Sequence, residues 1–479
     1  MPKARCVLTL DPANVCADAV GEEHGLRGDE VEGLKERIAD ARRQIEERRG
    51  GDIGFMELPY DRELAGRIRQ KAAEVRERCA NFVVLGIGGS ALGNIAVHAA
   101  LNHPFHNLLP EGHPGRLGAP RIFILDNVDP ALMAGFVDAV EDGLDRTVFN
   151  VITKSGTTAE TMSQFLFVRD LLRRKGLDPA AQIIATTDPR PEESLLQRIA
   201  AQEGYFTLPV PPNVGGRFSV LSAVGLLSAA VGGIDIDELL AGAAAMDEQC
   251  RAAALQENPA ALYAAILYLF YQKGKPITVL MAYSNALARL ADWYCQLWAE
   301  SLGKRDGLRA KDVFVGPTPI GAVGVTDQHS VMQLFQDGRF DKVITLIEAC
   351  PERSRGTERL TPGRKGRGAA GLPICRGKSE KELSYLAGAS FDKLFAAELT
   401  ATRCALRDKH RPNMTLKVPE VSARALGEMF MFFEYAVTYA GYLYGVDAFD
   451  QPGVELGKVY TYGLMGREGY KPPRGLAAR

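Results

Sequence analysis

Hydroxyl side chains crowd around one glycine between Thr153 and Thr158. The sequence there reads Thr-Lys-Ser-Gly-Thr-Thr, directly after the apolar run 148–152 and directly before a helical pattern of apolar residues. A strand, a polar turn and a helix start present backbone N–H groups and the positive end of a helix dipole to an anion. With one cation, Lys154, the turn predicts a site for a phosphate group carried on a small molecule. The alternative is a helix N-cap with additional Ser and Thr residues.

Two side chains farther along could stabilise charge and transfer a proton. Arg217 follows two glycines, and an arginine, which stays protonated, suits holding a developing oxyanion. A surface turn is the alternative. Glu300 lies beside the apolar stripe of a predicted helix over 286–302, and a carboxylate partly withdrawn from water is a useful base near neutral pH. The competing interpretation is an i, i+4 ion pair with Lys304.

Two more candidates lie where helices are predicted to begin. The positive end of a helix favours the neutral imidazole of His329, which can then accept or donate a proton. The alternative is a residue that merely neighbours a helix cap. The stretch 449–458 starts another helix and places three polar residues on one face, namely Gln451, Glu455 and Lys458. An ordinary amphipathic terminal helix would give the same pattern.

A glycine-rich turn at 86–91 follows another predicted buried strand. Its pattern matches the dinucleotide fingerprint G-x-G-x-x-A, which also requires an acidic residue about 20 residues further on. The acidic residue at the end of the next strand, Asp126, lies well beyond that distance, so the match is weak. Ser90 instead offers a second hydroxyl, and in a parallel sheet its turn and the turn at 153–158 would share one crevice.

These residues need a scaffold, and strands alternate with helices in both halves of the chain. This alternation predicts βαβ units and parallel, layered sheets. Apolar helices over 220–271 separate the halves. The segments 83–91 and 278–286 both give a strand, a small-residue turn and a helix, which indicates a faint internal repeat. The predicted strands lie at 7–10, 82–86, 121–127, 148–152, 182–187, 276–281 and 342–347.

Composition and length exclude several classes of protein. The 479 residues predict two to four domains. Eight cysteines include no CxxC pair and no Cys/His cluster, which argues against a disulfide framework or a zinc site and for a reducing compartment. The first ten residues lack the apolar core of a signal peptide, and the longest apolar run, 259–271, is too short for a bilayer. We therefore expect a cytoplasmic protein without membrane partners.

The charge balance also argues against nucleic-acid binding. A formal net charge of −2 creates no global field that would recruit a polyanion. The stretch 351–380 is rich in Arg, Gly and Pro but has no interleaved aromatic residues. This composition favours a solvated surface loop, to which we assign no role.

Taken in order, these stretches resemble the phosphoglucose isomerase family over residues 83–458. Residues 214–222 and 449–458 resemble the two family signatures. The segments 86–90, 153–158 and 299–304 and the pair Gln328-His329 follow the family order around them. The chain length and the compact turn at 153–158 resemble bacterial members, whereas Pro452 stands where some members carry an aromatic residue.

The resemblance implies an α/β fold of two SIS-type (sugar isomerase) three-layer αβα domains with parallel sheets, plus helical N- and C-terminal segments. It implies an N-terminal arm and helix in 1–60 and a first SIS-type domain with the phosphate-binding turn in 61–215. A helical connection in 216–275, a second SIS-type domain in 276–445 and a C-terminal helical segment carrying Lys458 in 446–479 complete the chain.

The same resemblance implies reversible isomerisation of glucose 6-phosphate and fructose 6-phosphate through a cis-enediol, in glycolysis and gluconeogenesis, without cofactor or metal. Glu300 would move the proton between C1 and C2, Arg217 would stabilise the enediolate, and His329 and Lys458 would assist ring opening. The implied substrate-binding set is Gly89, Ser90, Thr153, Lys154, Ser155, Thr157, Thr158 and Gln451. In the family the active site lies at a homodimer interface, and the histidine comes from the partner subunit.

Two other functions share parts of this pattern. A bifunctional phosphoglucose/phosphomannose isomerase differs only in accepting a second configuration at one hydroxyl, which these motifs do not discriminate. A non-catalytic SIS-type sugar-phosphate sensor would keep the turn at 153–158 but would not need Glu300, Arg217 and Lys458 together.

Overall fold

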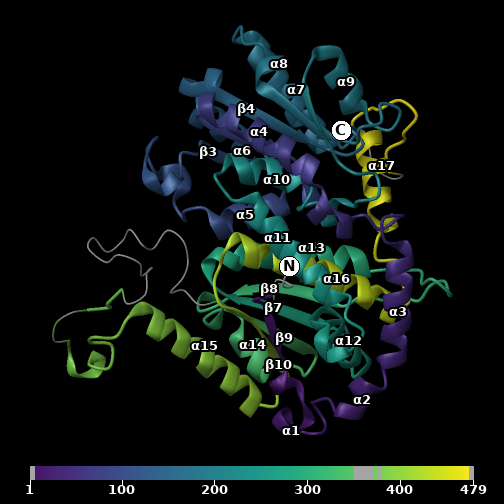
Figure 1. The fold of residues 1–479 in the computed structure, drawn as a ribbon, viewed down its shortest axis with the longest axis vertical. Helices are drawn as coiled ribbons and strands as arrows, with labels where there is room; N and C mark the ends of the chain where they lie inside the picture. Colours follow the sequence, from purple (N-terminus) through teal and green to yellow (C-terminus); the bar gives the residue numbers. More distant parts are fainter. Residues whose placement is uncertain (1–5, 350–371, 376, 378, 474–479) are drawn as a thin grey trace.

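The computed structural model describes residues 6–349, 372–375, 377 and 379–473 and contains two five-stranded sheets. Helices α11 (Ile236–Cys250), α13 (Ala288–Leu302) and α16 (Ala423–Tyr444) lie between the two sheets (Figure 1). The predicted α/β class with two layered units is confirmed. The five-part division of the chain stays our proposal, which the two sheets support. Most of the stretch 351–380 lies outside the described residues.

The first sheet is entirely parallel, with the order β3-β2-β4-β5-β6. Its strands are β2 (Asn81–Leu85), β3 (Arg121–Leu125), β4 (Thr147–Ile152), β5 (Ile183–Thr187) and β6 (Phe206–Pro209). All residues of β2, β4 and β5 are buried, as their apolar runs predict. One face packs on α4 (Arg62–Arg78), α5 (Leu92–Leu101) and α10 (Ala223–Val231), the other on α6 (Pro130–Val140), α7 (Ala159–Arg174) and α9 (Leu195–Glu203).

The strand order reverses between β2 and β4. The chain passes from β2 to β3 on one side and then returns to β4 on the other side of β2. Ligands of open parallel sheets bind at such a switch point, beyond the carboxyl ends of the strands. The turns that follow β2 and β4 are 86–91 and 153–158, so the prediction that they share one sheet edge is confirmed.

The second sheet repeats this order. Strand β7 (Ile277–Tyr283) takes the place of β2, with β8 (Thr318–Val323) on one side and β9 (Lys342–Ala349) and β10 (Asn413–Val418) on the other. The faint repeat in the sequence therefore marks equivalent central strands. The described N-terminal strand β1 (Thr9–Asp11) completes this sheet antiparallel to β10, so the arm contributes a strand to the second sheet.

Helices also cover both faces of the second sheet. Its inner face packs on α12 (Pro259–Gln272), α13 and α16, and its outer face on α14 (Met332–Asp337) and α15 (Phe391–Asp408). A continuous apolar core joins the inner faces of the two sheets. Among the described residues, none of the helices has the length and apolar character that a bilayer crossing requires.

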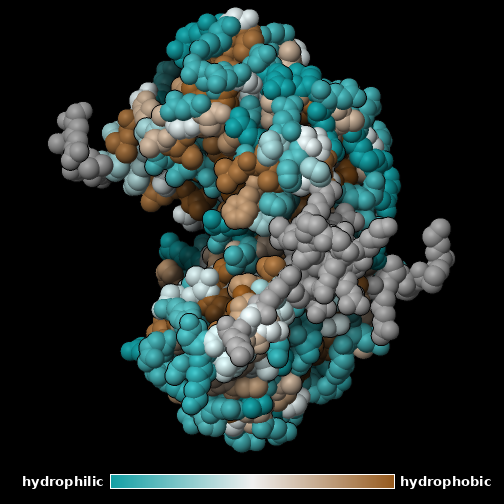
Figure 2. Space-filling view, turned by 90° about the vertical axis from the view of Figure 1, so that its left-hand side faces the viewer, coloured by the Kyte–Doolittle hydropathy of each residue, from teal (hydrophilic) through white to brown (hydrophobic). Residues whose placement is uncertain are grey.

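Apolar and polar residues are unevenly distributed on the surface. Figure 2 shows largely hydrophilic ends of the molecule, with apolar residues gathered where this face is hollowed between the two lobes. The C-terminal helix α17 (Glu455–Leu464) has no buried residue and exposes Leu456 and Leu464. Exposed apolar residues on a terminal helix indicate a surface that a partner could cover.

Candidate active site

The turn at 153–158 is built by a strand end, one left-handed glycine and the start of α7. Gly156 has φ +66°, and a side chain on it would lie 2.2 Å from the backbone nitrogen of Leu196. The close approach of α9 therefore requires glycine here. Thr158 precedes α7, but its side chain makes no capping hydrogen bond. A simple N-cap consequently does not account for these hydroxyls.

The hydroxyls of the turn are bonded to one another. Thr153 Oγ1 and Thr158 Oγ1 lie 3.2 Å apart, and Ser155 Oγ and Thr157 Oγ1 lie 2.9 Å apart. The backbone N–H of Thr157 donates to Ser155 Oγ at 3.2 Å. Hydroxyls can rotate to serve a ligand, so four of them at a helix start suit an incoming phosphate.

Lys154, expected near the phosphate, is bonded to backbone carbonyls. Its ammonium donates to the carbonyl oxygens of Pro212 and Val214, at 2.5 and 3.2 Å. Burial lowers the pKa of Lys154, and Asp188 opposes this effect. The lysine therefore links the turn at 153–158 to the loop that leads into Arg217.

Arg217 is buried and hydrogen-bonded to several distant residues, so it does not lie on an exposed surface turn. It is 2% exposed and lies in the short turn Gly216–Phe218. Its Nε donates to Ser301 Oγ at 2.7 Å, and Nη2 donates to the carbonyl oxygens of Ala448 and Asp450 at 2.6 and 3.0 Å. Burial lowers the pKa of Arg217, which Glu300 and Asp450 partly offset. The guanidinium is thus fixed in orientation by two segments of the chain, the end of α13 and the loop 448–450.

Glu300, near the end of α13, faces Arg217. Its Oε1 lies 3.3 Å from Arg217 Nη1, and its side chain is 24% exposed. Its Oε2 accepts a hydrogen bond from Gln296 Nε2 at 3.0 Å. The same Nη1 donates to Gln451 Oε1 at 3.0 Å. A partly accessible carboxylate beside a buried cation can remove a proton while the cation holds the resulting oxyanion.

The alternative ion pair between Glu300 and Lys304 is not formed, because Lys304 pairs with another carboxylate. Lys304 is buried, and its ammonium pairs with the Asp450 carboxylate at 2.7 Å and bonds the backbone carbonyls of Glu300 and Asp450. The Glu300 carboxylate therefore contacts Arg217 and Gln296 instead of Lys304. Lys304 instead links the end of α13 to the loop that carries Gln451.

The glycine-rich turn at 86–91 touches this cluster directly. A side chain on Gly89 would lie 2.2 Å from the carbonyl carbon of Gly216 and 2.6 Å from the nitrogen of Arg217. Gly88 has φ +56°, and a side chain there would meet Gln296 Nε2 at 3.1 Å. The turn that carries Ser90 thus lies against both the Arg217 turn and α13. Glycine permits this approach because it has no Cβ.

Lys458 and His329 are not part of this cluster. Lys458 lies on α17, is exposed and pairs with Glu455 at 2.6 Å. The same helix contacts the turn at 153–158, where Tyr462 OH donates to the carbonyl oxygen of Thr157 at 3.0 Å. His329 is exposed at the end of the turn Thr326–Gln328. Within the described chain it shares no hydrogen bond or ion pair with any other candidate residue.

Sequence reasoning missed Gln296 and Tyr462. Gln296 precedes Glu300 by one helical turn, and this i, i+4 spacing was the available signal. Its Oε1 is buried and has no hydrogen-bond partner among the described residues, so it is an acceptor ready for a ligand hydroxyl. Tyr462 gave no local signal, because its partner Thr157 lies 305 residues away. In the part of the chain described, no group of three or more His, Cys, Asp or Glu is arranged to hold a metal ion.

Comparison with known proteins of similar sequence and fold identifies one family. The family model described as phosphoglucose isomerase matches residues 62–466. A glucose-6-phosphate isomerase of Carboxydothermus hydrogenoformans is 45% identical over 93% of this chain and 92% of its own, and one of Rubrobacter xylanophilus is 44% identical over 94% and 96%.

Solved structures agree with the sequence comparison. A hypothetical protein of Thermus thermophilus has a TM-score of 0.81 and 33% identity, and covers 95% of this chain and 98% of its own. A glucose-6-phosphate isomerase of Chlamydia trachomatis has a TM-score of 0.74 at 23% identity, covers 93% and 87%, and supports the fold. The chain therefore belongs to the phosphoglucose isomerase family.

Proposed function

We propose that the chain interconverts glucose 6-phosphate and fructose 6-phosphate by ring opening and proton transfer through a cis-enediol. Membership of the phosphoglucose isomerase family and its named relatives support this reaction. The observation that carries the proposal is the Glu300 carboxylate 3.3 Å from the buried guanidinium of Arg217. A sensor would not need this pair beside a phosphate turn.

The phosphate would bind at one end of the site, at the N-terminus of α7. We assign the binding hydroxyls to Ser90, Thr153, Ser155, Thr157 and Thr158. The helix dipole and the backbone N–H groups of the turn favour a dianion there. Anchoring C6 in this way fixes the distance to the reacting carbons, which is the advantage of holding a substrate far from its reactive end.

The proton transfer would take place at the other end of the site. Glu300 removes the proton from C2 of the aldose or C1 of the ketose and returns it to the neighbouring carbon, a role worth roughly 10²–10⁴-fold in rate. Arg217 stabilises the enediolate oxygen, worth roughly 10²–10³-fold for one preorganised donor. Gln296 and Gln451 flank this pair and would bind sugar hydroxyls.

Ring opening needs an acid and a base at the ring oxygen and the C1 hydroxyl, and we assign these roles to His329 and Lys458. His329 is exposed and shares no described contact with the other candidate residues. We therefore propose a homodimer in which the partner subunit supplies the histidine. The exposed apolar residues of α17, which also carries Lys458, support an interface close to this site. A cytoplasmic location is part of the same proposal.

The test is turnover of fructose 6-phosphate by the purified protein, coupled to oxidation of the glucose 6-phosphate formed. Glu300→Gln should bind the sugar phosphate but lose exchange of the C2 proton with solvent deuterium. Glu63→Gln, an exposed carboxylate on α4, is the matched control and should behave as wild type. Isomerisation by Glu300→Gln at the wild-type rate would refute the assignment of the base.

A further inference from the structure

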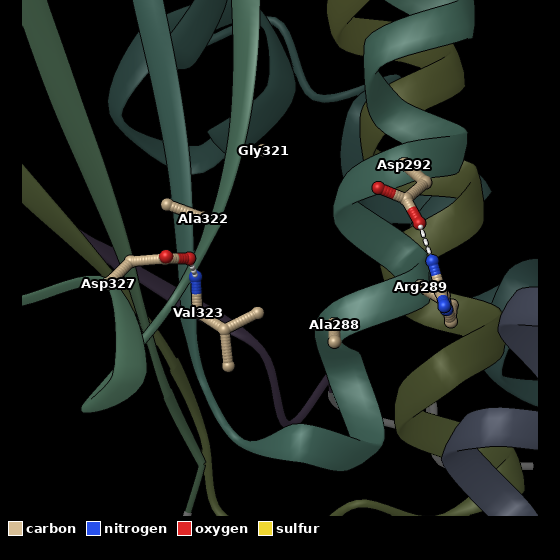
Figure 3. Close-up of a pocket in the computed structure, with 7 residues that line it drawn as sticks. All are labelled: Ala288, Arg289, Asp292, Gly321, Ala322, Val323 and Asp327. Atoms are coloured by element: carbon tan, nitrogen blue, oxygen red, sulfur yellow. Dashed lines mark hydrogen bonds and ion pairs between the residues drawn. The ribbon is translucent and has the colours of Figure 1, made fainter. Parts of the chain in front are cut away.

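The turn that carries His329 is held on both sides by one carboxylate. Asp327 accepts hydrogen bonds from the backbone N–H of Val323 and from Ser330 Oγ, both at 2.7 Å. Figure 3 shows Asp327 turned toward Val323, at the edge of a cavity of about 350 Å³ between β8 and the start of α13. The backbone N–H of His329 bonds the carbonyl oxygen of Thr326 at 3.1 Å, whereas its imidazole makes no hydrogen bond or ion pair with the described residues. The position of the imidazole therefore depends on the backbone of this turn.

A second and deeper anchor is the side chain of Gln328. Its Nε2 donates to Tyr283 OH at 2.6 Å and to Thr402 Oγ1 at 2.8 Å, with the carbonyl oxygen of Glu398 at 3.4 Å. An amide nitrogen has two hydrogens, so the two short bonds use its donor capacity. Both acceptors are buried, Tyr283 at the end of β7 and Thr402 on α15. Gln328 therefore connects the histidine turn to two rigid elements.

Tyr283 also supports the turn by packing. A side chain on Gly324 would lie 2.6 Å from the Tyr283 ring, so the backbone entering the turn lies directly on that ring. The Tyr283 ring also packs against the ring of Phe395 on α15, and the two ring centroids lie 5.8 Å apart. Burial raises the pKa of Tyr283, which keeps its hydroxyl protonated and neutral.

We propose that Thr402 and Tyr283, acting through Gln328, are positioning residues that aim His329 at the site it serves. This inference rests on the proposed function. An exposed imidazole at the end of a turn can reach a site only if the preceding backbone is fixed, and Gln328 is the residue immediately before it. A misplacement of about 1 Å costs on the order of 10²-fold in rate. Loss of the contacts that Gln328 makes with Thr402 and Tyr283 should slow ring opening and leave proton transfer by Glu300 unchanged.

The experiment replaces the Thr402 hydroxyl and compares two substrates. Thr402→Val keeps the shape of the side chain but leaves one amide hydrogen of Gln328 with only the long contact to the carbonyl oxygen of Glu398 at 3.4 Å. We expect kcat for fructose 6-phosphate to fall about 10- to 100-fold with KM changed less than about 3-fold. Turnover of 5-deoxyfructose 6-phosphate, which lacks the hydroxyl that closes the furanose ring, should be unchanged. Thr402→Ser should restore the wild-type rate.

A matched control lies on the same helix. Thr400 is exposed, and its hydroxyl bonds to the carbonyl oxygen of Ala396 at 2.8 Å, within α15. Thr400→Val should leave both substrates unaffected. Tyr283→Phe removes the other acceptor of Gln328 and gives an independent test if Thr402→Val does not fold. His329→Ala should show the same selective loss as both variants.

The outcomes separate this inference from the proposed function. If the wild type does not turn over fructose 6-phosphate, the proposed function fails. If the wild type is active and the Thr402→Val and Tyr283→Phe variants match it, the positioning role is wrong. Equal slowing of both substrates would also overturn the proposal, because it would indicate general loosening of the fold rather than misplacement of His329.

Discussion

Replacing Gly89 by alanine tests whether contact between two turns sets the position of Arg217. The new methyl group would lie 2.2 Å from the carbonyl carbon of Gly216, whereas ordinary van der Waals contact begins at 3.4 Å. The opposing atoms are backbone, so they cannot rotate away, and the two turns must part by about 1 Å. A displacement of this size at the reacting end costs roughly 100-fold in rate. Overpacking should also lower the free energy of unfolding by about 1–3 kcal/mol.

Steady-state kinetics with fructose 6-phosphate and urea unfolding measure the two effects. We expect kcat to fall more than the affinity for inorganic phosphate, because four of the five assigned phosphate hydroxyls lie on the turn at 153–158, which is not displaced, and only that of Ser90 moves with the 86–91 turn. Gly135→Ala is the control, since Gly135 lies exposed on α6 with no atom near its added methyl group. A folded Gly89→Ala protein with kcat within about 3-fold of wild type would refute the reasoning.

Three further predictions concern the half-buried Lys154, the buried Lys304 and the half-buried His98. Lys154→Met should lower kcat about 10-fold by freeing the loop before Arg217; a rise in KM alone would instead indicate direct binding of phosphate. Lys304→Met should lower the free energy of urea unfolding by about 2 kcal/mol, because it removes the charged donor to the Asp450 carboxylate and to the backbone carbonyl of Glu300; no change would contradict the role of this link. Burial lowers the pKa of the His98 imidazole to about 4 in the folded chain. The unfolded chain therefore takes up this proton at a higher pH than the folded chain does. As a result, the free energy of unfolding should fall by up to about 3 kcal/mol as pH drops from about 6.5 to 4. His98→Gln should remove this part of the pH dependence in urea titrations, and identical curves for variant and wild type would contradict it.

The central strands were predictable because each is an apolar run buried on both faces. The expected strands at 82–86 and 148–152 correspond to β2 and β4 within a residue or two. Strands β6 and β8 were missed because Thr, Pro and Gly interrupt their apolar residues, whereas the edge strand β3 keeps an apolar run and was predicted. Strand β10 was missed although the alternation of its Asn, Thr and Lys with apolar residues is itself a strand pattern.

Helix α15 was missed for a different reason. It was not predicted although its apolar residues Leu399 and Leu406 pack on the second sheet. Its importance became visible only through Thr402, whose hydroxyl bonds Gln328, 74 residues earlier in the chain. No local pattern indicates that a threonine on one helix supports a turn so far away.

The sequence by itself determined the parts of this protein whose chemistry is local. A hydroxyl-rich turn after a buried strand predicts an anion site through backbone geometry and the helix dipole, and these depend on neighbours within a few residues. The single glycine of that turn, Gly156, has the left-handed backbone that such a turn needs. The order of the motifs indicated the family, which the comparisons confirm.

Only the tertiary structure decided how these parts act on one another. Arg217 bonds Ser301, 84 residues away, and Gln451, 234 residues away. Lys154 turned out to hold a loop, and Lys304 to pair with Asp450 instead of Glu300. A long charged side chain can reach many partners, and which one it finds depends on the packing of distant segments. Spacing along the chain cannot encode that choice, because the competing partners are brought within reach only when both sheets have assembled around the shared core.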